Sequence, residues 1–457
     1  MKKVFICLSG ENILRNFVET KSFHKIEKKF DTTYFVNSSL KKYIFKNQNK
    51  KFFDVSNYND HITQKISKLF FFSNLNKSKS YKYRYLRLLP FYELYNSNNT
   101  TLVRFYNFFK SVFFNKKSLW HLLILPVISL FFFKKYFYKK YHNEITIPLE
   151  IKKLLKKNKN NKIIFIIPSA GVDFLSIAID KIKKEYINVL DIIIINNWDN
   201  LSSKGGFWHK PNKLIVWGKA SKNDAKKIFD LDKEVVCLGP PNYENYFKIR
   251  DKKILPIYNF KYILFSGPAL QFDEIRVLKK LDIILDKKKF RNLKLVYRPH
   301  PFRQNRKSMD NFFNCNFKHI ILDKDAKKYY MKGNTANKKT KLKYYPSLLK
   351  NAEFIIAPLS SLLIESLIFY KKVLVILHND KHHFTTPYRN FKNLDHLQIL
   401  KKAKTLNFSY NLDDLETSID KTISKKYSKK RYSNFIKKII NEPKNYQGKL
   451  FELVDSL

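Results

Sequence analysis

One segment of the chain reads IIAPLSSLLIESLIFYKKVLVI, from Ile355 to Ile376. Its two ends are short apolar runs rich in β-branched residues, as in strands that are buried on both faces. Between them, residues 361–369 have the composition of a helix. A strand, a helix and a second strand in this order form a βαβ unit, whose two strands are parallel. The segment therefore predicts an open α/β sheet.

Similar runs recur along the chain, so the same architecture is expected throughout. We predict strands at 4–8, 162–168, 189–196, 213–217, 234–238, 262–266, 292–298, 319–322, 353–358 and 373–377. We predict helices at 174–185, 219–229, 273–285, 344–351 and 361–369. Strands that alternate with helices in this way indicate parallel sheets covered by helices.

Glycine is rare, with nine in 457 residues, where average usage would give about 32. Five of the nine lie at the end of a predicted strand: Gly10, Gly171, Gly218, Gly239 and Gly267. Open α/β sheets bind their ligands at the carboxyl ends of the strands. The position of these glycines therefore indicates ligand-binding loops.

Two blocks of alternating strands and helices predict two domains, at 1–247 and 261–425. A basic, aromatic insertion at about 81–142 interrupts the first, and a tail at 426–457 has a helical composition that leaves a return to the first block open. Residues 323–343 contain few apolar side chains, and we expect a mobile loop there.

The formal charge of +51 leaves three explanations open. AT-rich codons specify Lys, Asn, Ile, Phe and Tyr, all of which are abundant, so codon usage alone could raise the charge. Attraction to an anionic membrane and binding of nucleic acid are the alternatives. No known nucleic-acid-binding module is recognisable in the sequence, so we do not expect that partner.

Three features bear on the location of the protein. Cys7, Cys237 and Cys315 lie far apart, which argues against disulfides or structural zinc and fits a reducing cytoplasm. The apolar stretch Val4–Leu8 is too short for a signal peptide. The apolar segment 118–133 falls short of the ~20 residues of a membrane span. It could be a buried helix or an element at the lipid headgroups.

The sequence VYRPHP, residues 296–301, places Arg298 and His300 each before a proline. A following proline favours extended backbone, in which residues i and i+2 project to the same side. A guanidinium beside an imidazole suits a phosphate or diphosphate, and the histidine could protonate a leaving phosphate. The alternative is a turn whose histidine caps a neighbouring carbonyl.

Ser360 and Ser361 stand where the helix of the opening segment should begin. Their hydroxyls and the free amides of the first helical turn can bind phosphate oxygens. Glu365, one turn later, could accept the hydroxyls of a ribose. The alternatives are an ordinary N-cap for the serines and a solvated helical face for the glutamate.

Arg-Pro-His-Pro followed about sixty residues later by Ser-Ser and a helix resembles the C-terminal half of GT-B-type transferases. The pattern is similar to bacterial polysialyltransferases, capsule Kdo transferases and CDP-glycerol glycerophosphotransferases, over residues 160–380. The resemblance implies that Arg298 and His300 contact donor phosphate and that the two serines hold the nucleotide phosphate. It also places Ser266 and Gly267 in a loop near phosphate. Tyr370-Lys371-Lys372 replaces the usual Gly-Lys-Pro, which questions a ribose role for Glu365.

The first block should then carry the acceptor and the general base. Asp199 is the first candidate base, followed by Glu11 and Asp173; His209 beside aromatic residues is weaker. The acceptor-binding candidates are Gly10, Gly171, Asp173, Asn200 and Lys204. No metal-ligand cluster is visible and no cofactor is expected, because transferases of the GT-B type usually work without a bound metal.

We therefore expect a GT-B-like protein with two Rossmann-like domains facing a cleft. It would move a sugar from a CMP-, CDP- or UDP-linked donor, with a cytidine-linked donor favoured, to a bacterial surface polysaccharide or its lipid-linked precursor. It would act in the cytoplasm, peripherally on the inner face of the membrane. The alternatives are a CDP-polyol phosphotransferase and a non-catalytic basic protein that binds nucleic acid or glycan.

Overall fold

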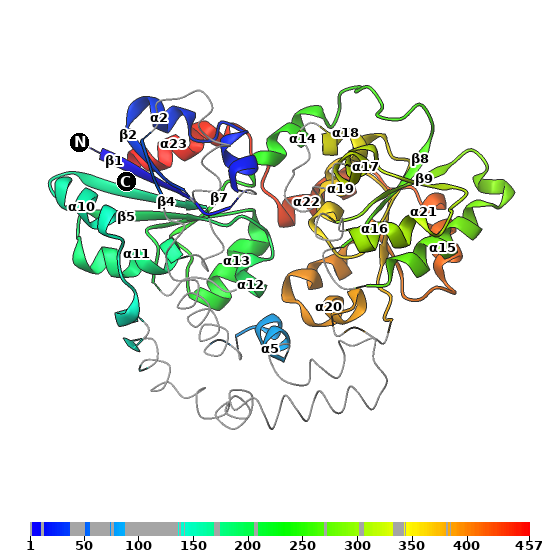
Figure 1. The fold of residues 1–457 in the computed structure, drawn as a ribbon, viewed down its shortest axis with the longest axis horizontal. Coiled ribbons are helices and arrows are strands. Elements are labelled where there is room, and N and C mark those ends of the chain that lie inside the picture. Colours follow the sequence, from blue (N-terminus) through cyan, green and yellow to red (C-terminus); the bar gives the residue numbers. More distant parts are fainter. Residues whose placement is uncertain are drawn as a thin grey trace. The chain divides into compact units, whose positions relative to one another are not determined.

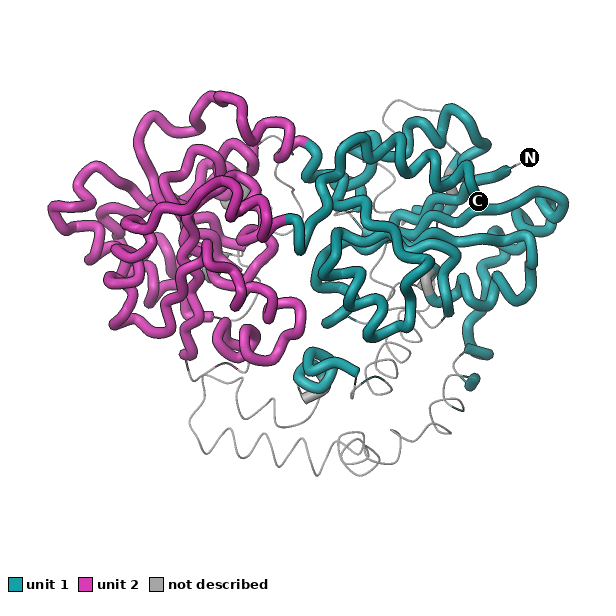
Figure 2. Tube along the Cα trace, turned by 180° about the vertical axis from the view of Figure 1, so that it is seen from behind, with its two compact units in different colours: residues 1–90, 109–244, 437–457 teal, residues 91–108, 245–436 magenta. Residues whose placement is uncertain are grey.

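The computed structural model describes residues 2–10, 13–36, 51–54, 74, 77–86, 136, 139–140, 142–168, 174–204, 209–268, 272–300, 306–331, 342, 344–380, 383 and 385–457. They form two compact units (Figure 2). Unit 1 contains the described residues within 1–90, 109–244 and 437–457, and unit 2 those within 245–436.

Unit 1 is built on a parallel sheet of seven strands. The strands are β1 (Lys2–Leu8), β2 (Asp31–Val36), β3 (Lys51–Asp54), β4 (Lys162–Pro168), β5 (Val189–Ile194), β6 (Lys213–Val216) and β7 (Val235–Cys237). Their order is β3-β2-β1-β4-β5-β6-β7. The first six follow the 3-2-1-4-5-6 order of Rossmann folds, in which the strand order reverses between β1 and β4.

Helices cover both faces of this sheet (Figure 1). One face packs against η1 (Leu14–Val18, a π-helix), α2 (His24–Lys29) and α23 (Tyr446–Ser456). The other packs against α10 (Leu149–Lys157), α11 (Phe174–Glu185), α12 (Asn200–Ser203) and α13 (Lys219–Phe229), and α5 (Lys79–Leu86) lies against α12. The strands are buried on both faces, which explains their unbroken apolar runs.

Unit 2 repeats the same topology with six parallel strands. They are β8 (Tyr262–Ser266), β9 (Lys294–Arg298), β10 (Ile320–Leu322), β11 (Ile355–Ala357), β12 (Val373–Ile376) and β13 (Leu406–Ser409). Their order is β10-β9-β8-β11-β12-β13, again 3-2-1-4-5-6. The order therefore reverses between β8 and β11, which is where a ligand site is expected.

The helices of unit 2 also lie on both faces of its sheet (Figure 1). One face packs against α15 (Glu274–Leu285), α16 (Arg306–Phe313), α17 (Lys324–Met331) and α21 (Leu415–Ser424). The other contacts α18 (Tyr344–Asn351) and α19 (Ser361–Ile368). The remaining helices are η2 (Pro241–Tyr243) and α14 (Glu244–Ile249) at the unit boundary, η3 (Lys288–Phe290), α20 (Pro387–Asn393), η5 (Asp395–Lys402) and α22 (Lys429–Ile439).

The predicted fold class is confirmed, and every predicted strand and helix forms at its predicted place. The sequence did not reveal β2, β3 or β13. β2 begins with the polar residues Asp31, Thr32 and Thr33, and β13 has only four residues, so neither stands out as an apolar run.

The prediction of a mobile loop at 323–343 is wrong for its first part, where α17 forms. Asp323 accepts a hydrogen bond from the backbone N–H of Ala326 at 3.3 Å, and Ala326 is buried in the core. Asp325 pairs with Arg298 at 2.9 Å. Polar contacts therefore hold a helix that its apolar content alone does not predict.

The C-terminal tail is divided between the two units rather than forming one element. α22 reaches the boundary at 436/437, and α23 buries Tyr446, Leu450 and Val454 in the core of unit 1. The segment between them crosses the ends of β6 and β7, where the Asn441 N–H donates to the Trp217 carbonyl. A Cβ on Gly218 would lie 2.6 Å from the Ile439 carbonyl oxygen. These contacts, and not a ligand, account for the glycine after β6.

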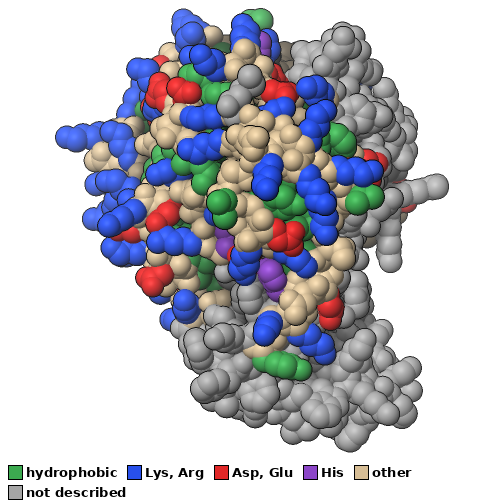
Figure 3. All heavy atoms as spheres, turned by 90° about the vertical axis from the view of Figure 1, so that its left-hand side faces the viewer, with side chains coloured by type: hydrophobic (Ala, Val, Ile, Leu, Met, Phe, Trp, Pro, Cys, Tyr) green, Lys and Arg blue, Asp and Glu red, His purple; other side chains and the backbone are tan. Residues whose placement is uncertain are grey.

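Lysine and arginine side chains spread over the coloured part of the face shown in Figure 3, with acidic side chains between them. They do not gather in one groove on this part of the face. Within the described ranges, no helix is long and apolar enough to cross a membrane. The segment 118–133 and most of the insertion at 81–142 lie outside the described residues.

Candidate functional site

The reversal of strand order in unit 2 brings three predicted loops to one edge of the sheet. Ser266 is paired with Arg298 across β8 and β9, and Phe265 with Ile356 across β8 and β11. The Gly267 N–H donates to the Arg298 carbonyl at 2.9 Å. The loops after β8, β9 and β11 therefore start at the same level, at the carboxyl edge of neighbouring strands.

The N-terminus of α19 brings polar groups to this edge. Ser360 is the N-cap residue in extended conformation, but its side chain does not cap the helix. Within the described part of the chain, its Oγ is buried without a hydrogen-bond partner. Ser361 is the first helical residue, and the apolar face of α19 is buried against the sheet. An available hydroxyl beside free backbone amides and a positive helix end suits an anion.

Arg298 does not contribute a free guanidinium to this edge. Its side chain is only 3% exposed, and its Nη1 forms ion pairs with Asp323 and Asp325. Its Nε donates to the Tyr345 hydroxyl at 3.3 Å, and the ring of Tyr345 lies 4.9 Å from the guanidinium carbon. Two carboxylates and a phenol thus surround the charge of Arg298 in this structure, and its contact with donor phosphate stays a prediction.

Asp323 is the centre of the network that holds Arg298. Its carboxylate also accepts hydrogen bonds from the hydroxyls of Tyr258 and Tyr344. Burial, and then the charge of Asp323, raises the pKa of both phenols, so they stay protonated and act as donors. This network anchors the end of β9 against α17 and α18.

His300 lies two residues beyond the anchored end of β9 and is partly exposed. Pro299 between them is buried, so the backbone leading to the histidine is held in place. Arg298 is buried whereas His300 is partly exposed, so the two side chains differ in their access to solvent. A role of His300 toward phosphate stays a prediction.

Glu365 is partly exposed on α19, and its carboxylate accepts a hydrogen bond from the Tyr246 hydroxyl at 2.8 Å. The Tyr246 ring stacks on Phe369 at 5.5 Å. The carboxylate is therefore oriented by a phenol from α14. A ribose hydroxyl would have to share the Glu365 carboxylate with the Tyr246 hydroxyl. The ribose-binding role of Glu365 also stays a prediction.

Tyr370 stands where the Gly-Lys-Pro pattern has its glycine. It follows α19 with φ +58°, the left-handed conformation that usually requires glycine at a helix end. Its N–H donates to the Leu367 carbonyl, and the next N–H donates to Ser366. The ring lies 5.2 Å from the Arg250 guanidinium carbon. Contacts of the side chain thus offset the strain, and the turn forms without glycine.

Glu274 is a residue of this edge that the sequence patterns did not reveal. It is 4% exposed at the start of α15 and accepts a hydrogen bond from the Tyr297 hydroxyl. A Cβ on Gly267 would lie 2.6 Å from its carboxylate oxygen, so the glycine leaves room for the buried carboxylate. Asp273 caps the same helix through the Arg276 N–H at 3.1 Å.

His378, directly after β12, is a second residue that was not predicted from the sequence. It is 6% exposed, and its Nε2 lies 2.8 Å from Ser409 Oγ, which in turn lies 2.6 Å from Asp414 Oδ1. Burial lowers the pKa of His378 to about 4, so the ring is neutral at pH 7. His300 was singled out because it follows an apolar strand. His378 follows an apolar strand as well, so the same pattern could have identified it as a candidate site residue.

In unit 1, the predicted acceptor residues follow β1, β4 and β5. A Cβ added to Gly10 would meet no atom of the described chain within 4 Å, so there is open space beside this glycine. Asp199 pairs with Lys204 at 3.0 Å, and Asn200 is buried at the start of α12. Glu11, Gly171 and Asp173 lie outside the described residues.

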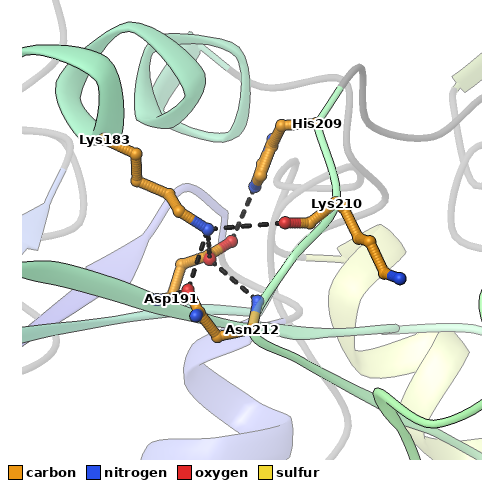
Figure 4. A network of polar contacts seen from close by, with 5 residues as sticks. All are labelled: Lys183, Asp191, His209, Lys210 and Asn212. Atoms are coloured by element: carbon orange, nitrogen blue, oxygen red, sulfur yellow. Dashed lines mark hydrogen bonds and ion pairs between the residues drawn. The ribbon is translucent and has the colours of Figure 1, made fainter. Parts of the chain in front are cut away.

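His209 belongs to a network toward the amino ends of β5 and β6, away from these loops (Figure 4). Its Nε2 lies 2.7 Å from the carboxylate of Asp191, and Lys183 Nζ lies 2.6 Å from the same group. The Asn212 N–H also donates to it at 3.1 Å. Burial opposes ionisation of Asp191, but these partners lower its pKa below the ordinary value. The network is structural, because it lies at the edge opposite the ligand-binding loops.

Among the described residues, no group of three or more His, Cys, Asp or Glu side chains could hold a metal ion. Besides carboxylates such as that of Glu274, the described residues at the carboxyl edge of unit 2 offer helix amides, serine hydroxyls and histidines. Such groups can bind an anionic leaving group through hydrogen bonds and partial charges.

No family model matches the chain, and no curated protein matches it in sequence. Solved structures do match its fold. MnaA of S. aureus, in a co-structure with UDP, has a TM-score of 0.51 at 11% identity, over 100% of this chain and 96% of that chain. UDP-GlcNAc 2-epimerase of Methanocaldococcus jannaschii, in complex with UDP-GlcNAc and UDP, has a TM-score of 0.50 at 12% identity and full coverage of both chains. The calicheamicin glycosyltransferase CalG4 has a TM-score of 0.50 at 7% identity, over 100% and 97%. At this identity the likeness concerns the fold alone, and the chain has the GT-B-like fold of two Rossmann-like domains.

Proposed function

We propose that the protein is a glycosyltransferase that binds a nucleotide-activated sugar at the carboxyl edge of the unit 2 sheet. The donor phosphate would be held at the N-terminus of α19 by Ser360, Ser361 and the backbone amides. His300 would approach the same phosphate from the loop after β9 and supply a proton or a charge to the leaving nucleotide.

One observation carries this proposal. The N-terminus of α19, with the buried and available Ser360 hydroxyl, ends the loop after β11, and the strand order reverses between β11 and its neighbour β8. Open α/β sheets bind their ligands at this place, and helix N-termini bind phosphates. Arg298 would act indirectly, by holding the end of β9 that carries His300.

The donor and acceptor follow from two further considerations. The resemblance of the RPHP and Ser-Ser motifs supports a cytidine-linked donor, whereas fold neighbours in complex with UDP and UDP-GlcNAc support a uridine-linked one. The acceptor would be a surface polysaccharide or a lipid-linked precursor. The charge of +51 supports a peripheral position on the anionic inner face of the cytoplasmic membrane.

A CDP-polyol phosphotransferase is the closest alternative, because it would use the same nucleotide site and attack phosphorus instead of an anomeric carbon. A nucleotide-sugar epimerase is a further alternative. One of the fold neighbours is a UDP-GlcNAc 2-epimerase, and another was solved with UDP. Incubation with UDP-GlcNAc alone distinguishes an epimerase from a glycosyltransferase, because an epimerase converts its substrate without any acceptor.

Thermal stabilisation by CMP-, CDP-, UDP- and GDP-linked compounds tests the nucleotide site. A ligand that binds only the folded state at a hundred times its Kd stabilises the protein by about 2.7 kcal/mol. We expect one base to stand out. Ser360→Ala should reduce this stabilisation, and Ser424→Ala, an exposed serine of α21, should leave it unchanged.

Two results would contradict the proposal. If no nucleotide stabilises the protein, the site is not a nucleotide site, and a non-catalytic basic protein becomes the better interpretation. If His300→Ala turns over the donor as fast as the unmodified protein, the histidine has no part in the reaction.

A further inference from the structure

A run of cations covers the last turn of α21, the loop after it and the first turn of α22 (Figure 1). Residues 421–431 read KTISKKYSKKR and include no acidic residue. We call this stretch the basic segment. All six of its cations are exposed: Lys421, Lys425, Lys426, Lys429, Lys430 and Arg431. More than half of the basic segment is therefore exposed positive charge.

The charge of the basic segment is not neutralised by the protein. No acidic side chain in the described part of unit 2 pairs with any of its six cations. The contacts that these cations do make are with neutral groups. Lys425 Nζ donates to Asn407 Oδ1 at 2.9 Å, and Lys429 Nζ lies 5.8 Å from the centre of the Tyr370 ring. The basic segment therefore keeps its full charge at the surface.

Other lysines beside the same helix are paired, in contrast to those of the basic segment. Lys287 Nζ lies 2.6 Å from the carboxylate of Glu416, and Lys289 Nζ lies 2.7 Å from that of Asp420. Both acidic residues belong to α21. Codon usage can account for the number of lysines in the chain. It does not account for six cations without a single carboxylate in one short stretch.

The charges at the start of α22 oppose the dipole of that helix. Lys429, Lys430 and Arg431 form its first turn, which contains no acidic residue. A helix N-terminus is positive and favours acidic side chains. Ser428 offsets this only in part, since its Oγ accepts a hydrogen bond from the Arg431 N–H at 3.3 Å. The arrangement is unfavourable for the protein alone and becomes favourable when a layer of negative charge lies against it.

Aromatic side chains hold the basic segment in place at the amino edge of the unit 2 sheet. Tyr432 is 2% exposed, and its ring lies 5.9 Å from that of Tyr370. Tyr427 packs on Tyr432 at 6.0 Å. Lys372, directly before β12, donates to the Ile423 carbonyl. The basic segment therefore lies beside the start of β12, at the edge opposite the proposed nucleotide site.

Two features favour a lipid bilayer over a nucleic acid as the partner. Ile423 is 37% exposed among the cations, and apolar side chains between lysines are typical of elements that lie at lipid headgroups. Proteins that bind single-stranded nucleic acid present aromatic rings on which the bases stack. The single aromatic residue of the basic segment, Tyr427, packs against Tyr432, and its hydroxyl is buried. Anionic headgroups attract polybasic segments by charge and require no stacking surface.

We propose that the basic segment docks on an anionic phospholipid bilayer. This inference deepens the proposed function, on which it rests for the identity of the bilayer as the inner face of the cytoplasmic membrane. The docking itself rests on the unpaired cations, the exposed Ile423 and the position at the amino edge. Because that edge is opposite the proposed nucleotide site, the protein should bind lipid and nucleotide at the same time.

Co-sedimentation of the full chain with vesicles tests the docking. Vesicles of phosphatidylcholine alone are compared with vesicles that contain about one third phosphatidylglycerol, and only the latter should bind the protein. The combined variant Lys425→Gln, Lys426→Gln, Lys429→Gln and Lys430→Gln should bind them roughly ten-fold more weakly or less, since each cation near an anionic surface adds to the attraction. The matched control combines Lys279→Gln, Lys288→Gln, Lys327→Gln and Lys328→Gln, at exposed positions of unit 2. It removes the same charge and should change binding by less than about two-fold.

Both variants should keep the melting temperature of the original protein, because all eight lysines are exposed and glutamine has a similar helix propensity. The inference is overturned if the anionic vesicles do not bind, if phosphatidylcholine alone binds equally well, or if the two variants weaken binding equally. It is also overturned if a labelled RNA oligonucleotide binds more tightly than the anionic vesicles and loses its binding in the first variant, since the basic segment would then serve nucleic acid.

Nucleotide-induced stabilisation, measured on the same proteins, separates this inference from the proposed function. Both variants should retain it. Vesicle binding through the basic segment without stabilisation by any nucleotide would contradict the proposed function alone. Stabilisation by a nucleotide without vesicle binding through the basic segment would contradict this inference alone.

Discussion

Protonation of His378 should make unit 2 sensitive to mild acid. The imidazole is 6% exposed, and its ring lies against Phe272 at the end of β12. Its Nε2 faces Ser409, whose hydroxyl is directed to the Asp414 carboxylate, so the ring is the tautomer with hydrogen on Nε2. Nδ1 is buried without a partner in the described part of the chain, and a proton added there would meet no acceptor.

The size of the effect follows from the pKa, which burial lowers from 6.5 to about 4 in the folded protein. Between these two values the unfolded chain binds a proton that the folded chain does not. The stabilising contribution is therefore complete above pH 6.5 and is lost as the pH falls toward 4. The full difference corresponds to about 3 kcal/mol, and about 2 kcal/mol of it should be lost between pH 7 and pH 5.

Urea denaturation of the original protein and of His378→Gln at pH 7, 6 and 5 measures this loss. Glutamine keeps a donor toward Ser409 but does not titrate, so the variant should lose about 2 kcal/mol less over this range. His24→Gln, whose histidine side chain is 49% exposed, is the control and should keep the original pH dependence. The reasoning is refuted if His378→Gln and the original protein lose the same stability between pH 7 and pH 5.

Five further substitutions test the packing. Tyr446→Phe should raise the free energy of unfolding in urea by about 1 kcal/mol, because the buried hydroxyl of Tyr446 has no partner in the described chain. Tyr262→Phe should lower this free energy by about 1 kcal/mol, because it removes a hydrogen bond to a backbone carbonyl. Gly218→Ala should cost about 2 kcal/mol or more, since the new Cβ meets a carbonyl oxygen at 2.6 Å, and Gly10→Ala should change the melting temperature little. Asp323→Asn should cost about 3 kcal/mol in urea denaturation by leaving a buried guanidinium underpaired. Equal effects of the two tyrosine changes, or of the two glycine changes, would contradict these packing roles, as would an Asp323→Asn variant of unchanged stability.

The sequence was sufficient to predict the sheets because burial on both faces leaves a local trace. Runs such as Ile163–Ile167 and Val373–Ile376 are apolar at successive positions, and this composition is visible without any knowledge of neighbouring strands. The helix after Ser360 was predicted for a similar reason, since its start and its apolar face are encoded within a few residues. The α17 helix escaped prediction because its stability depends on Arg298, which lies some twenty-five residues away in the chain.

The roles of the strand-end residues depended on tertiary structure. Gly10 and Gly218 both follow a strand, yet one borders open space and the other is covered by the C-terminal tail. Arg298 precedes a proline as His300 does, but the chain after β10 and α17 place two carboxylates beside it, which pair its charge. By itself the sequence determined which segments are strands and where loops reach the carboxyl edge, because burial and backbone geometry are local. Only the tertiary structure decided which side chains at that edge are already paired, because their partners come from distant parts of the chain.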